Sequence, residues 1–133
     1  MEFRRLNETD YDNILVGWWK KWRWIAPSRD FLPENGSGGI MVSKDGVDIC
    51  AGFVYFTNSK VAWIEFIVSN FDYKEKDRKD ALKYLIDSIN TIALGMGYKF
   101  IYTSVKNQNL INVYTDCGFT MGSVNCQEMV KIL

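Results

Sequence analysis

The sequence predicts an α/β (α+β) domain built on a mixed, mostly antiparallel sheet of six to seven strands. Segments rich in β-prone residues alternate with stretches of helical periodicity in the order β-α-β-β-β-α-β-α-β-β. A long helix separates the fourth strand from the fifth, so these two can pair in parallel, whereas short turns join the strands before them. The 133 residues include only two prolines and no repeat or low-complexity tract, which favours one domain over residues 1–133.

The N-terminal part begins with a short strand at residues 2–6 and continues as a helix through about residue 23. Thr9, followed three positions later by Asp12, resembles a capping box at the start of that helix. Apolar residues recur at three- and four-residue steps on one stripe, which consists of Tyr11, Ile14, Leu15, Trp18, Trp19 and Trp22. Residues 26–38 contain both prolines and are predicted to form a loop.

The middle of the chain is predicted to form three strands at residues 39–44, 47–56 and 61–68. Asp45-Gly46 between two β-prone runs indicates a tight hairpin, and a second turn leads into the third run. That third run is apolar on both faces apart from Glu65, which is typical of a strand covered on both sides.

The C-terminal half returns to helical periodicity over residues 77–94, and glycines follow directly. The remaining elements are a strand at 99–105, a short helix at 108–116, and two short strands at 119–124 and 126–133.

The composition limits the chemistry that the chain can perform. It has no histidine, so Ser-His-Asp and Cys-His nucleophile pairs and His-rich zinc sites are excluded, and we expect no metal site. Sixteen basic and sixteen acidic residues give a formal net charge of zero, which argues against a nucleic-acid partner. The three cysteines form no CxxC pair and are expected to be reduced. No run of about 18 apolar residues occurs, so we expect no membrane association and a cytoplasmic location.

Nearly the whole chain resembles the Gcn5-related N-acetyltransferase (GNAT) superfamily. Four features carry the resemblance: Asp45-Gly46 followed by Gly52-Phe53, a fourth strand ending in Ile67-Val68, the long helix after it, and the ending Asn107, Leu110, Tyr114, Gly118-Phe119. That ending is similar to the family's N-x-x-A-x-x-L/F-Y-x-x-x-G-F pattern. The resemblance implies a single GNAT-like domain with helices on both faces of the sheet. It also implies a parallel pair that splays apart between strands 4 and 5 to admit acetyl-CoA as co-substrate.

The same resemblance implies which residues bind the cofactor. Backbone groups of Ile67 and Val68 would bond its pantetheine arm like an added strand. Asn107 matches the family's asparagine near that arm, although asparagine is also a common helix cap. The expected pyrophosphate loop contributes Lys74, Lys76, Asp77, Arg78 and Lys79.

This loop departs from the family pattern Q/R-x-x-G-x-G/A, because Asp77 and Lys79 occupy the two places of small residues. Side chains there should weaken cofactor binding, while the nearby cations and a helix start capped by Asp77 should partly restore it. Alternatively, a mixed-charge run of this kind is only the solvated start of a helix.

Amide formation from an acyl thioester needs a base for the ammonium and an acid for the departing thiolate. Glu65 is the candidate base because desolvation within its strand would raise its pKa, although it could instead pair with a lysine or arginine. Tyr114 matches the family's tyrosine, often the general acid, although it could instead be a core residue.

Two hypotheses of function follow. The first is an acyl-CoA-dependent N-acyltransferase that transfers acetyl to a primary amine of a small molecule or protein, as a monomer or a homodimer. Its acceptor would lie among Trp24, Asp30, Phe31 and Glu34, which suit an aromatic or cationic amine. The second is a catalytically inactive GNAT-fold interaction or scaffold protein that has lost CoA binding. An acyl-carrier protein as donor is a third option, since the loop's cations suit an acidic surface.

Overall fold

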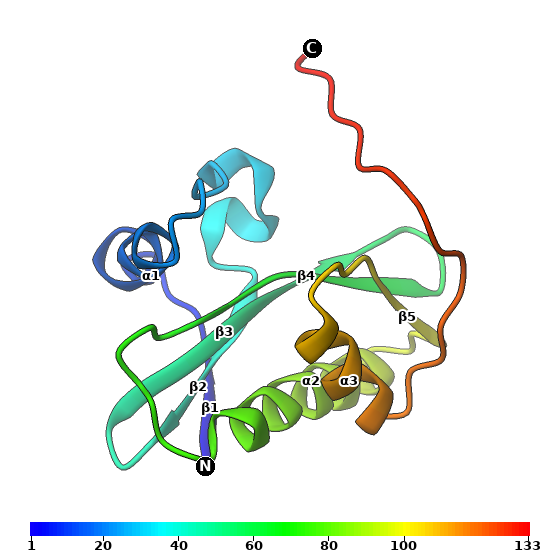
Figure 1. Cartoon of the computed structure of the whole chain (residues 1–133). Helices are drawn as coiled ribbons and strands as arrows, with labels where there is room; N and C mark the ends of the chain where they lie inside the picture. Colours follow the sequence, from blue (N-terminus) through cyan, green and yellow to red (C-terminus); the bar gives the residue numbers. More distant parts are fainter.

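A five-stranded sheet forms the centre of the computed structural model, which describes residues 1–133 (Figure 1). The strands lie in chain order and are β1 (Glu2–Arg5), β2 (Gly39–Lys44), β3 (Val47–Phe56), β4 (Val61–Ser69) and β5 (Phe100–Thr103). Neighbours from β1 to β4 are antiparallel, and β4 and β5 are parallel. The predicted mixed, mostly antiparallel sheet is confirmed, whereas the prediction of six to seven strands is wrong.

The error lies at the C-terminus, where the strands expected at residues 119–124 and 126–133 do not form. The segment instead runs irregularly away from the sheet (Figure 1). Asn125 has φ 59° between the two expected strands, and Met129 and Ile132 are more than nine-tenths exposed. β-prone residues form a strand only where a neighbouring strand and a packed face receive them. Phe119 packs on the core, but residues 120–133 are exposed and pair with no strand.

The β2–β3 hairpin confirms the prediction from Asp45-Gly46. Both turn residues have positive φ, 52° at Asp45 and 78° at Gly46, as a type I′ turn requires. The turn sets the register in which Lys44 lies beside Val47, and an irregularity between Val42 and Ser43 then shifts the register by one residue, so that Ile40 lies beside Gly52.

Helices cover both faces of the sheet, as expected. Figure 1 shows α2 (Arg78–Gly95) and α3 (Gln108–Asp116) on one side and α1 (Val16–Lys21) on the other. Alternation along β2 divides the core accordingly. Ile40 and Val42 belong to the apolar cluster beneath α2, while Met41 belongs to the cluster with the tryptophans of α1. No helix is both long enough and apolar enough to cross a bilayer.

The segment between β1 and α1 is tied down by polar side chains. Arg4 donates two hydrogen bonds to the buried carboxylate of Asp10, at 2.7 and 3.0 Å, and the backbone N–H of Asn7 donates to the same group at 2.7 Å. The predicted capping box at Thr9 and Asp12 is wrong, because Asn7 Oδ1 accepts from the N–H groups of Thr9 and Asp10 instead. A π-helical turn (Tyr11–Leu15) then leads into α1.

Candidate functional site

β4 and β5 pair only along the first part of β4. Val61 through Ile64 lie in register with Phe100 through Thr103, and the hydroxyl of Thr103 donates to the carbonyl of Ile64 at 2.8 Å. β4 then continues to Ser69 without a partner on this side. The carbonyl of Ser69 accepts from Trp22 Nε1 at 2.8 Å, whereas the backbone groups on that edge of residues 65–68 are available to an extended ligand. The pairing of the two strands thus ends before β4 does.

A β-bulge lies at the start of the unpaired part of β4. The register with β3 shifts between Ala51 and Phe53, and Phe66 adopts φ 57°. This left-handed conformation is unfavourable for a bulky residue and costs about 1–3 kcal/mol. Gly52 lies beneath the bulge, where an added Cβ would stand 3.0 Å from Cγ1 of Ile67. The bulge bends β4 at the point where β5 leaves it.

Glu65 is the first residue of β4 beyond the pairing with β5. Its side chain is half-buried, and Trp63 Nε1 donates a hydrogen bond to its Oε2 at 2.8 Å. Burial raises the pKa of Glu65 above its ordinary value, the Trp63 bond opposes this rise, and the charge of Glu128 adds to it. None of the ion pairs in the chain includes Glu65, so the alternative of a surface pair with lysine or arginine is not what the structure shows.

Tyr114 reaches the same region from α3. Its side chain is 4% exposed and packs edge-on against Phe119, with ring centroids 4.9 Å apart. Its hydroxyl lies 3.3 Å from Thr103 Oγ1, at the last β4–β5 pair. Burial raises the pKa of Tyr114, and the nearby charge of Glu65 adds to the rise. Tyr114 is thus a core residue whose hydroxyl lies at the end of the paired region.

Glu65 and Tyr114 approach the gap from opposite faces of the sheet. Ile64 belongs to the cluster beneath α2 that also contains Tyr114, and Glu65 follows it on the alternating face. Two reactants could therefore meet at the gap from opposite sides.

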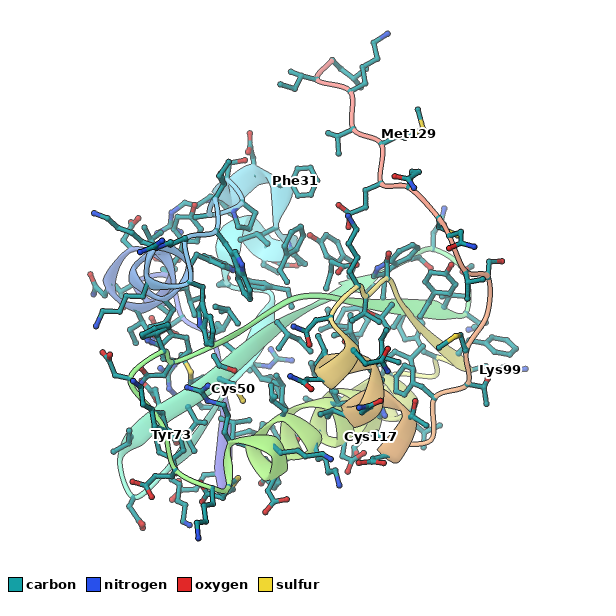
Figure 2. All side chains as sticks on the ribbon, viewed as in Figure 1. Phe31, Cys50, Tyr73, Lys99, Cys117 and Met129 are labelled. Carbon is teal, nitrogen blue, oxygen red and sulfur yellow. The ribbon has the colours of Figure 1, made fainter.

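An open cavity of about 600 Å³ lies on the Glu65 side of the sheet. Its aromatic lining comes from Phe31, Tyr55, Trp63, Phe66 and Tyr102, and its polar lining from Thr57, Glu65, Ser104, Gln127 and Glu128, together with Met129 and Val130. Figure 2 shows Phe31 and Met129 on the same side of the sheet, away from Cys117. The cavity is thus bounded by β3, β4, the end of β5, the loop before β2 and the C-terminal segment.

The N-terminus of α2 follows the loop that leaves β4. No side chain caps it, so the prediction that Asp77 does so is wrong. The Asp77 carboxylate instead accepts from Lys44 Nζ and from the hydroxyl of Tyr73, each at 2.7 Å, and Lys44 and Tyr73 hold the pKa of Asp77 below its usual value. Its charge is therefore neutralised by Lys44. The N–H of Arg78 donates to the carbonyl of Glu75 at 3.3 Å, whereas the N–H groups of Lys79 and Asp80 make no backbone hydrogen bond and are available to an anion.

Comparisons with known proteins identify the architecture. No protein-family model and no curated protein matches the sequence. N-acetylglutamate synthase from Neisseria gonorrhoeae, complexed with coenzyme A and L-arginine, matches with a TM-score of 0.72 at 16% identity, over 96% of this chain and 29% of that one. The ribosomal-protein-S18-alanine N-acetyltransferase from Escherichia coli gives 0.69 at 14%, over 92% and 79%. AAC(6')-Iy with the bisubstrate analog CoA-S-monomethyl-acetylneamine gives 0.69 at 17%, over 98% of each chain. The chain has the Gcn5-related N-acetyltransferase fold.

Two of the loop cations that the GNAT resemblance assigns to the cofactor's pyrophosphate are engaged elsewhere in the fold. Arg78 turns back to donate to the carbonyls of Asn70 and Phe71, at 2.9 and 3.3 Å, and its guanidinium lies over the ring of Trp22. Lys79 pairs with Asp116 of α3 at 3.5 Å. Arg78 thus holds the loop in shape and Lys79 joins two helices.

Two other loop lysines are less constrained. Lys74 lies over the ring of Phe71 at 5.5 Å, and neither Lys74 nor Lys76 takes part in an ion pair. These two remain available for phosphate groups.

Asn107 is the N-cap of α3 in this GNAT-fold chain. Its Oδ1 accepts from the backbone N–H of Leu110 at 3.1 Å. The side-chain oxygen of Asn107 therefore acts as a helix cap, which was the alternative to a cofactor contact. Ile67 and Val68 both lie in the unpaired part of β4, where their backbone edge is open toward β5.

The acceptor residues expected from the sequence are only partly those that line the cavity. Phe31 lines it, whereas Trp24 stacks on Trp22 with centroids 5.5 Å apart and Asp30 accepts from Ser28. Sequence reasoning missed Trp63 and Glu128. The alternation that placed Glu65 on one face of β4 also places Trp63 there, so this signal was present. Nothing in the sequence indicated that the C-terminal segment passes beside the cavity at residues 127–130.

Proposed function

We propose that the chain is an acyl-CoA-dependent N-acyltransferase that passes acetyl from acetyl-CoA to a primary amine. The observation that carries the proposal is the gap between β4 and β5, with a half-buried carboxylate on one face of the sheet and a buried phenol on the other. An extended thioester in the gap would have Glu65 and Tyr114 on its two sides. The fold shared with CoA-bound N-acetylglutamate synthase supports the same function.

The cofactor would lie along β4 and end at α2. Its pantetheine arm would bond the free backbone edge at Ile67 and Val68. Its pyrophosphate would lie at the uncapped N-terminus of α2, where the helix dipole and free N–H groups favour an anion, with Lys74 and Lys76 nearby. The carboxylate of Asp77 is paired with Lys44. Asp77, where the family has a small residue, should therefore weaken phosphate binding less than the sequence alone suggests.

The reaction then follows from the two groups at the gap. Glu65 takes a proton from the acceptor's ammonium, and the neutral amine attacks the thioester carbonyl carbon. The carbon–sulfur bond breaks, the thiolate takes the phenolic proton of Tyr114, and the proton lost by the new amide nitrogen restores the phenol. Burial suits both roles, because the raised pKa of Glu65 makes it a stronger base and burial disfavours a lasting phenolate at Tyr114.

Cofactor binding and transfer are tested with the purified chain. Acetyl-CoA at about 100 times its Kd should stabilise the fold by about 2.7 kcal/mol in a thermal unfolding experiment. Release of free thiol in the presence of a mixed panel of primary amines should follow. Tyr114→Phe keeps the ring against Phe119 and should lower kcat by about 100-fold. No thermal shift at millimolar acetyl-CoA, together with no thiol release, would contradict the proposal.

An inactive scaffold is the second candidate, and the observation that favours it is the presence of Asp77 and Lys79 where the family pattern has small residues. It predicts that the natural chain does not bind CoA and that the double variant Asp77→Gly with Lys79→Gly does. Calorimetric titration of both proteins with CoA separates the two functions, since tight binding by the natural chain rejects the scaffold.

A further inference from the structure

We propose that the cavity beside Glu65 selects, as the acceptor, a small organic cation with an aromatic or apolar body and no carboxylate of its own. This inference rests on the proposed function, because it names the class of amine that the same site would acetylate. It is supported by the negative charge of the cavity lining, the aromatic side chains in that lining, and the volume of the cavity.

The charge of the lining is negative and uncompensated. Glu65 and Glu128 are among the twelve lining residues, and no lysine or arginine is. None of the ion pairs in the chain involves either carboxylate. The two are close enough for the charge of Glu128 to raise the pKa of Glu65. In a chain with equal numbers of acidic and basic residues, this local excess favours a positively charged ligand.

The walls are aromatic on two sides. Trp63 and Tyr102 are neighbours in the parallel register, with ring centroids 4.4 Å apart. Phe31 packs edge-on against Phe66 at 5.7 Å, and the hydroxyl of Tyr55 holds this loop through the carbonyl of Phe31 at 2.9 Å. Aromatic faces attract cations and also cover apolar groups, so one set of walls suits both parts of an arylalkyl or alkyl amine.

The volume of the cavity and the absence of lysine and arginine from its lining narrow the class of acceptor further. A volume of about 600 Å³ is suited to a small molecule rather than to a folded protein surface. A ligand carboxylate would have no cationic partner among the lining residues, and burying it unpaired is unfavourable. Amino acids should therefore be poor acceptors, and amines without a carboxylate should be good ones.

Calorimetric titration without acyl-CoA tests this with three probes of similar shape: phenethylamine, its neutral isostere 2-phenylethanol, and phenylalanine, which carries a carboxylate. Phenethylamine should bind about tenfold or more tightly than the other two. Glu128→Gln should weaken phenethylamine about fivefold and leave 2-phenylethanol unchanged, because an exposed charge contributes modestly. The matched control Glu2→Gln removes an exposed carboxylate on β1, far from the cavity, and should change nothing.

Each result has a defined meaning. Equal affinity for the three probes, no binding of phenethylamine at millimolar concentration, or an unchanged affinity in Glu128→Gln overturns the inference. Trimethyl(2-phenylethyl)ammonium, which cannot be acetylated, should compete with phenethylamine in binding and in transfer. Cation-selective binding without any acetyl transfer would support the inferred ligand class and contradict the proposed function. Transfer to phenylalanine in preference to phenethylamine would support the proposed function and contradict the inferred acceptor class.

Discussion

The two parts of β4 belong to one strand of nearly uniform apolar composition, yet they differ in how their backbones pair with β5. Residues 61–64 are bonded to β3 on one side and β5 on the other, while residues 65–69 are open on the β5 side. The first part holds the fully buried Ala62 and Ile64, and the second holds Glu65 and the strained Phe66. Val68 in the second part is buried as well, so the two parts differ in their backbone pairing and in the residues next to the junction. The comparison teaches that the candidate reactive groups and the strained residue collect where the ladder with β5 ends.

The largest expected effect concerns the carboxylate at the junction of the two parts. Glu65→Gln should lower kcat for acetyl transfer by about 10²- to 10⁴-fold, because the variant keeps an acceptor for Trp63 Nε1 but no longer takes a proton. Steady-state thiol release at saturating acetyl-CoA measures it. The matched control is Glu2→Gln, which removes an exposed carboxylate on β1 at the opposite edge of the sheet from β5. A Glu65 variant as active as this control would remove Glu65 from the mechanism.

A paired substitution measures how differently the two parts carry stability. Ile64→Ala should cost about 2–4 kcal/mol of unfolding free energy, because Ile64 is fully buried and the variant leaves a cavity. Ile67→Ala should cost only about 1 kcal/mol, since Ile67 is half-buried in the unpaired part. Urea denaturation of both variants tests the difference. Equal losses would mean that the open part of β4 is as tightly packed as the closed part.

The strands and helices that the sequence could predict are those whose signals are local. Asp45-Gly46 specifies its own turn, and the stripe that includes Leu85 and Ile89 specifies the buried face of α2. The wrong predictions depend on distant partners. Asp77 fits a helix cap by sequence, but Lys44, 33 positions away, takes its carboxylate. The C-terminal residues have strand propensity, but no neighbouring strand receives them.

The residues of the candidate site divide in the same way, into those with a local sequence signal and those placed by distant partners. Glu65 could be found from the sequence because it interrupts an apolar run, and Tyr114 because it matches a family pattern. The wall formed by Trp63 and Tyr102 depends on the parallel register of β4 and β5, which a helix of 18 residues separates in the chain. The arrival of Glu128 at the cavity depends on the path of an irregular segment. Neither follows from periodicity, since both are set by tertiary packing.

A smaller effect is expected at the glycine beneath the bulge. Gly52→Ala would place a Cβ 3.0 Å from Ile67 Cγ1 and 3.3 Å from Leu85 Cδ2, so both side chains must move. We expect a loss of about 1 kcal/mol in unfolding free energy. We also expect a higher KM for acetyl-CoA, because Ile67 belongs to the open edge proposed to hold the cofactor. The urea midpoint and the KM are measured on the same preparation, and Gly46→Asn serves as the control because asparagine suits a turn that meets no neighbours. An unchanged KM would separate the bulge from cofactor binding.

The smallest effect is a pH dependence of stability that distinguishes Glu65 from carboxylates that pair within the fold. Its pKa in the folded chain is raised above the ordinary value of 4.5, so the folded state binds more protons than the unfolded state between these two pKa values. Stability from this group is therefore fully present below about pH 4.5 and is lost as the pH rises through the folded pKa. Glu65→Gln removes that loss, so the variant should unfold at a higher temperature than the natural chain at pH 7, with the difference shrinking toward pH 4. Asp10, whose pKa Arg4 lowers, has the opposite sign, and Asp10→Asn should lose most stability at pH 7. If thermal scans across this range gave both variants the same pH trend, the carboxylate at the end of the paired region would be as well accommodated as a structural ion pair, and the contrast between the two parts of β4 would not extend to their charges.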